Sequence, residues 1–109
     1  MFTQKTIEQA WVLYQASLKH SSPEKDYDKL IEEDNEFYAA VLDDASSLDD
    51  AVYSEFADKL HMLFRWLFRT YEPKSYDEAV EITKYAMEWF DDKYERQIGP
   101  DRWNLKESL

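Results

Sequence analysis

Pairs of carboxylates spaced three residues apart are the feature of this sequence that could support metal chemistry. Residues with this spacing lie on the same face of a helix, where two acids can share one divalent cation. Five acidic pairs have it, namely Glu33/Glu36, Glu55/Asp58, Glu78/Glu81, Glu88/Asp91 and Asp92/Glu95. With 24 acidic residues among 109, about five such pairs are expected from composition alone. The spacing by itself therefore predicts no metal ligand and no cofactor.

Two of these pairs suggest an enzymatic alternative. Glu33-x-x-Glu36 and Glu88-x-x-Asp91 resemble the ExxE and ExxD pairs of all-α nucleotide pyrophosphatases. That resemblance implies a magnesium-dependent hydrolase in which these acids hold the metal ion.

Other catalytic arrangements find little material in the chain. Cysteine is absent, His20 and His61 are the only histidines, and Gly99 is the only glycine. A thiol nucleophile and a glycine-rich phosphate loop are therefore excluded. We expect a protein that is not an enzyme and keep the magnesium-dependent hydrolase as an alternative.

The acidic residues are concentrated in one third of the chain. Residues 26–59 contain twelve acids and two lysines, a net charge of −10, whereas the whole chain carries −11. Such a charge repels nucleic acid and acidic membranes and attracts basic surfaces. We predict that a basic protein binds to this acidic face, through the carboxylates of Asp26, Asp28, Glu32, Glu33, Glu36, Asp43, Asp44, Asp49 and Asp50. The competing interpretation is a solvated surface without a function of its own.

The most concrete form of the first prediction is an inhibitor or immunity protein. In size, charge and class the chain is similar to nuclease-immunity proteins, to anti-restriction and anti-CRISPR proteins, and to other DNA mimics. No motif matches a particular one of these families, so no site residues carry over. We expect the protein to be cytoplasmic and to occupy the basic groove of a nuclease or another nucleic-acid-binding enzyme. Direct binding to nucleic acid or to a membrane is not expected.

The elements that must position these residues read as helices. Apolar residues recur at helical spacing, and the start signals are Thr6, Ser47, Ser75 and the Ser22-Pro23 pair. We predict an all-α protein, a compact antiparallel four-helix bundle in one domain spanning residues 1–109. The expected helices cover about 6–20, 23–45, 48–71 and 76–98. A short tail, 99–109, either packs on the bundle or docks elsewhere.

Two places interrupt the helical pattern. Asp34 falls on the apolar stripe of the second predicted helix, so that it is either paired with His61, Arg65, Arg69 or a tyrosine, or reaches water at the edge. Met62 and Trp66 widen the apolar surface of the third predicted helix. They suit either a central helix or an alternative interface for an assembly partner, including a homodimer.

Overall fold

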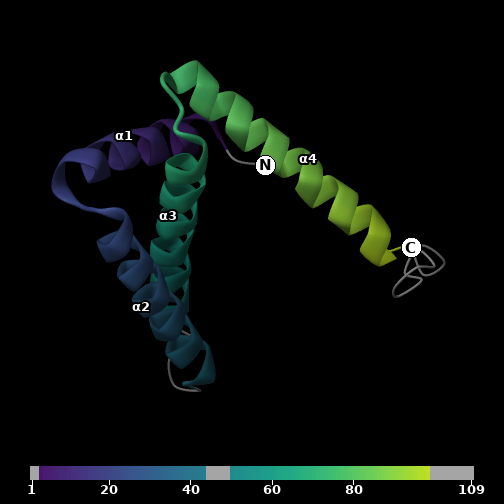
Figure 1. The fold of residues 1–109 in the computed structure, drawn as a ribbon. Helices are drawn as coiled ribbons and strands as arrows, with labels where there is room; N and C mark the ends of the chain where they lie inside the picture. The colour runs from purple at the N-terminus through teal and green to yellow at the C-terminus, as the bar shows by residue number, and fades with distance from the viewer. Residues whose placement is uncertain (1–2, 44–49, 99–109) are drawn as a thin grey trace. The chain divides into compact units, whose positions relative to one another are not determined.

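The computed structural model describes residues 3–43 and 50–98. This part of the chain forms four helices and no strand: α1 (Gln4–His20), α2 (Pro23–Leu42), α3 (Ala51–Tyr71) and α4 (Tyr76–Ile98) (Figure 1). The all-α prediction is confirmed. None of these helices combines the length and the apolar character that crossing a membrane requires.

Side-chain caps fix where three of the helices begin. The Ser22 hydroxyl accepts the Lys25 N–H at 3.2 Å, with Pro23 as the first residue of α2. The Ser75 hydroxyl accepts the Glu78 N–H at 3.2 Å at the start of α4. Both caps follow the sequence signals. Helix α1 begins earlier than predicted, because Thr3 and not Thr6 caps it.

The end of α2 and the start of α3 also differ from the prediction. Helix α2 ends at Leu42, where the Asp43 N–H reaches the Ala39 and Ala40 carbonyls, and α3 begins at Ala51. Asp43 and Asp50 were predicted to be helical but lie just outside these two helices. The other predicted helical residues, 44–45 and 48–49, the Ser47 cap and the tail at 99–109 lie outside the described residues.

The chain divides into two compact units, Met1–Glu72 and Pro73–Leu109. In the first unit, α3 packs against both α1 and α2. Helices α2 and α3 lie side by side and run antiparallel (Figure 1). Two ring contacts between the helices agree with this direction, because residue numbers rise along α2 as they fall along α3. Tyr27 contacts Trp66 and Phe37 contacts Phe56, with ring centroids 6.1 and 6.0 Å apart. This register decides which side chains of the two helices face each other.

Aromatic packing holds α1 against α3. Phe68 is fully buried, and Tyr14, only 3% exposed, meets its ring edge-on at 5.8 Å. Ile7 and Ala10 continue the buried side of α1 toward its N-terminus. Burial raises the pKa of the Tyr14 hydroxyl, with Glu72 adding to the effect and Arg69 opposing it.

The predicted apolar stripe of α2 is not its buried side. Tyr27, Ile31, Tyr38 and Val41, whose helical spacing defined that stripe in the sequence, are all exposed, at 44 to 65%. Among the described elements α2 packs against α3 alone, and the residues that it buries there are Asp26 and Glu33. The buried seam is therefore rotated around the helix from the stripe, and it carries two carboxylates.

Candidate metal centre

Five carboxylates from two helices meet on one side of the α2–α3 pair. Glu33 belongs to two groups of three acids, with Glu32 and Glu36 on its own helix and with Glu55 and Asp58 on α3. In each group, one oxygen from every side chain lies within 4.8 Å of the others. We call these five residues the carboxylate cluster.

Helix geometry and register bring the cluster together. Glu33 and Glu36 are one turn apart on α2, and Glu55 and Asp58 are one turn apart on α3. Because the two helices run antiparallel, these pairs lie at the same level of the hairpin. The charges of neighbouring carboxylates repel each other, so the fold holds them together at an electrostatic cost.

Glu33 is the buried centre of the cluster. The residue is 4% exposed, and its Oε1 forms an ion pair with Lys29 Nζ at 2.9 Å. Its Oε2 is buried and has no hydrogen-bond partner, and the same is true of Glu55 Oε2. A buried carboxylate oxygen without a partner is unfavourable, because it has lost water and gained nothing in return.

The electrostatic strain is visible at Glu36. Although its side chain is exposed overall, partial loss of hydration raises the pKa of Glu36 to about 7. The charges of Glu33, Glu55 and Glu32, together with a hydrogen bond to the Glu55 carboxyl, act in the same direction. At neutral pH the cluster is thus short of positive charge.

This donor set fits a hard divalent cation. Mg²⁺ and Ca²⁺ prefer oxygen ligands, and carboxylates are their usual protein ligands. The unpartnered oxygens of Glu33 and Glu55 supply two buried donors from two helices, and Glu36 and Asp58 supply exposed donors beside them. Because Glu32, Glu36 and Asp58 are exposed, one side of the cluster faces solvent.

The predicted acidic face is only partly an exposed surface. Asp28, Glu32, Glu36, Asp43 and Asp50 are exposed, and Asp44 and Asp49 lie outside the described residues. Asp26 and Glu33 are buried, contrary to the prediction. They were placed off the apolar stripe, but the structure shows that α2 turns this side toward α3.

Asp26 is neutralised completely by residues from the rest of the first unit. Arg69 Nε and Arg65 Nη1 both donate to its carboxylate, the latter at 3.2 Å, and the Ser21 hydroxyl donates at 2.7 Å. Arg69 Nη2 also donates to the Ser17 carbonyl at 3.1 Å, which ties α1 to the same point. Burial would raise the pKa of Asp26, but these hydrogen bonds and the two guanidinium charges lower it below its usual value. We call Asp26, Arg65, Arg69 and Ser21 the Asp26 node.

The structure also places the two exceptions to the predicted pattern, Asp34 and the Met62/Trp66 pair. Asp34 stays at the edge, with its side chain 60% exposed and 2.7 Å from Lys59 Nζ, so the structure supports the edge interpretation. Met62 is only 4% exposed and is not available as the predicted alternative interface. Trp66 is half-buried against the ring of Tyr27.

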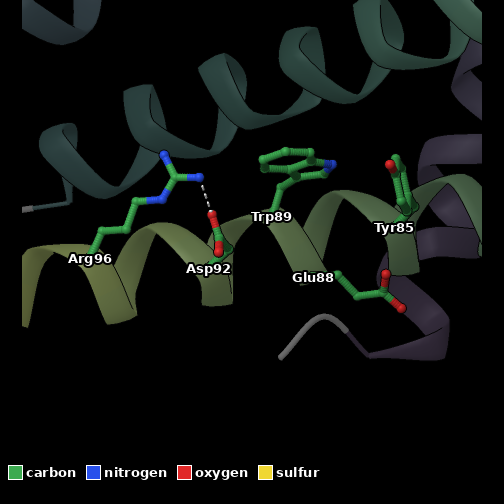
Figure 2. A pocket seen from close by; sticks show the side chains of 5 residues that line it. All are labelled: Tyr85, Glu88, Trp89, Asp92 and Arg96. Carbon is green, nitrogen blue, oxygen red and sulfur yellow. Dashed lines mark ion pairs between the residues drawn. The ribbon is translucent and has the colours of Figure 1, made fainter.

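The Glu88/Asp91 pair does not take part in either acidic group of the described residues. It lies on α4, in the second unit. Glu88 lines a shallow pocket with Tyr85, Trp89, Asp92 and Arg96. In it, the Tyr85 and Trp89 rings meet edge-on at 6.5 Å and Arg96 pairs with Asp92 at 2.8 Å (Figure 2).

The pair that does join Glu33 and Glu36 is Glu55/Asp58. Sequence reasoning treated it as one of five background pairs. The signal that could have found it is the order of the elements, because acid pairs on two consecutive helices meet when those helices form an antiparallel hairpin.

Comparison with known proteins gives no family for this chain. No protein-family model, no curated protein and no solved structure matches it.

Proposed function

We propose that the protein is a divalent-cation-dependent hydrolase of phosphorylated nucleotides, with the carboxylate cluster as its metal site. The observation that carries this proposal is the buried Glu33, whose Oε2 has no hydrogen-bond partner and whose carboxylate lies among acids from two helices. A packed fold rarely gathers like charges around an unpartnered buried oxygen unless a ligand compensates them.

The acid pairs support the choice of substrate class. Glu33-x-x-Glu36 on α2 and Glu55-x-x-Asp58 on α3 have the ExxE and ExxD patterns of all-α nucleotide pyrophosphatases, and here the two pairs face each other. Protein sites for Mg²⁺ typically combine one or two carboxylates with the phosphates of a substrate. The partly exposed cluster leaves room for such phosphates.

The residues of the cluster have distinct tasks in this proposal. Glu33 and Glu55, from the two helices, would hold the ion from the buried side, and Glu36 and Asp58 would hold it from the exposed side. A bound divalent cation polarises a phosphoryl oxygen and lowers the pKa of a coordinated water. The rigid hairpin keeps the four carboxylates in place, so that substrate binding does not have to order them.

The test is cation binding and substrate turnover by the same protein preparations. Isothermal titration with Mg²⁺ and Mn²⁺ and release of phosphate or pyrophosphate from nucleoside triphosphates are measured for wild type, Glu36→Gln and Asp58→Asn. We expect the wild type to bind the cations and to release product, and we expect each variant to lose at least about tenfold in cation affinity and in the rate of product release. The control is Glu81→Gln, an exposed acid of α4 from another acid pair, which should behave as the wild type does.

Two results would refute parts of the proposal. A wild-type protein that binds neither cation has no metal site at the cluster. A protein that binds cations at the cluster but releases no product from any nucleotide is not the proposed hydrolase.

We propose as a second candidate that the exposed acids of α2 bind a basic protein, such as a nucleic-acid-binding enzyme, and exclude its nucleic acid. The supporting observation is that Asp28, Glu32 and Glu36 remain exposed on one helix within a segment of net charge −10. Asp26 and Glu33 take no part, because they are buried.

This candidate is tested by retention of lysate proteins at low and at high salt. The variant Asp28→Lys/Glu32→Lys should lose a basic partner that the wild type retains only at low salt. A partner that both proteins retain equally at both salt concentrations would contradict it.

A further inference from the structure

Lys29 is the cation that the fold itself supplies to the carboxylate cluster. Its Nζ lies 2.9 Å from Glu33 Oε1 and 3.5 Å from Glu32 Oε1. Both ion pairs follow from its position one turn before these acids on α2. In the described part of the chain, no other lysine or arginine forms an ion pair with a member of the cluster.

The two partners of the closer ion pair differ in their freedom to leave. The Lys29 side chain is 47% exposed, whereas the Glu33 side chain is 5% exposed. A half-exposed lysine can swing its ammonium into water without disturbing the packing. Glu33 is held in the α2–α3 seam and cannot reach water in the same way.

One monovalent ammonium is also too little for this cluster. Lys29 reaches Oε1 of Glu33, while Oε2 of the same carboxylate and Oε2 of Glu55 stay without a partner. A divalent cation among the same acids would serve these oxygens and bring twice the charge. Two positive charges a few ångströms apart repel each other, whether or not they share an oxygen.

We infer that Lys29 is a built-in counter-ion, which neutralises Glu33 when the cluster holds no metal and competes with a divalent cation for it. The inference rests on the proposed metal site and adds its regulation. Lys29 sets the cation concentration at which the site fills, and the cation in turn releases the lysine to solvent or to a substrate phosphate.

The test is the cation affinity of the full chain when Lys29 loses its charge. Isothermal titration with Mg²⁺ and Mn²⁺ is compared for wild type, Lys29→Met and Lys29→Arg. We expect Lys29→Met to bind each cation about tenfold more tightly, and Lys29→Arg to stay near the wild type because it keeps the charge. The matched control is Lys84→Met, which removes an exposed i,i+3 pair with Glu81 at 3.8 Å and should not change the affinity.

A second measurement uses the wild-type protein alone, so that it does not depend on how the variants fold. The side-chain ammonium and methylene signals of the lysines are followed by NMR during a titration with Mg²⁺. The Lys29 signals should move to the positions of a free lysine as the site fills, while those of Lys84 stay unchanged.

The outcomes separate this inference from the proposed function. If the wild type binds the cation but Lys29→Met binds it equally or more weakly, or the Lys29 signals do not move at saturation, the counter-ion role is wrong and the metal site stands. If the wild type binds no cation, both are wrong.

Discussion

The Asp26 node and the carboxylate cluster show two ways in which the fold compensates the charge of a buried carboxylate on α2. Each centres on a carboxylate of α2 that is almost fully buried against α3, and the two acids are about two turns apart. Asp26 receives two guanidinium groups and a hydroxyl. Glu33 pairs with one half-exposed lysine and lies among four further acids.

The difference teaches which buried charge is structural and which is available to a ligand. Arg69 is nearly as buried as Asp26, with 10% of its side chain exposed, so that both charges of the pair are fixed by packing. At Glu33 the compensating charge is half-exposed and incomplete. A carboxylate with lowered pKa marks the first situation, and a neighbouring carboxylate with a pKa near neutrality marks the second.

The largest expected effect comes from breaking the Asp26 node. Asp26→Ala should lower the free energy of unfolding by about 3–5 kcal/mol, because it leaves the largely buried Arg69 and the partly buried Arg65 without their acid. Chemical denaturation at pH 7 measures the change. Asp92→Ala, which removes an exposed pair with Arg96, is the control and should cost less than about 1 kcal/mol. Equal costs for the two variants would show that the node does not stabilise the fold as described.

The contribution of the Asp26 node to stability should be lost at low pH, and Asp26→Asn should remove this pH dependence. Because the folded pKa lies below the unfolded value near 3.8, its contribution to stability is complete above that value. It is lost as the pH falls through the folded pKa.

The cluster should show the opposite pH dependence in the absence of cations. The pKa of Glu36 rises from 4.5 to about 7 on folding, so the folded state binds more protons between these values and stability falls as the pH rises through them. Thermal unfolding in a chelating buffer should therefore give a lower midpoint at pH 8 than at pH 6. Glu36→Gln should reduce that difference and raise the midpoint at pH 8, whereas Glu81→Gln should leave both unchanged. A wild-type midpoint that rises over this range and falls in Glu36→Gln would contradict the strain assigned to the cluster.

The smallest expected effect belongs to Asp34, which has neither kind of environment. Its pair with Lys59 is exposed on the acid side, and Lys59 also lies over the Phe37 ring, 5.2 Å from its centroid. Asp34→Asn should change the free energy of unfolding by less than about 1 kcal/mol. Denaturation beside Asp26→Asn measures the contrast, and a cost at Asp34 as large as that at Asp26 would remove the distinction between edge and seam.

The sequence predicted the local features of the fold and missed its register. The caps at Ser22 and Ser75 and the four helices depend on neighbouring residues, so the pattern revealed them. The facing side of α2 depends on how α3 is rotated, which no residue of α2 specifies alone. For the same reason Arg65 and Arg69 were named among the possible partners of Asp34, whereas the acid that they pair with in the structure is Asp26.

The candidate site was partly within reach of the sequence. Glu33 and Glu36 were proposed for metal binding by resemblance, but with Glu88 and Asp91 as the second pair. Spacing along one helix cannot tell a background pair from a functional one. The contact between Glu33 and the Glu55/Asp58 pair arises only once the hairpin closes.

The connection of α2 and α3 as consecutive antiparallel helices has a consequence for folding kinetics. Contacts near their junction, such as Phe37 with Phe56, close a short loop, whereas Asp26 and Arg69 are 43 residues apart. Short loops lose less chain entropy and close first. We therefore expect the repulsion among the cluster's acids to slow the folding rate, and the Asp26 node to form after the transition state and slow unfolding instead.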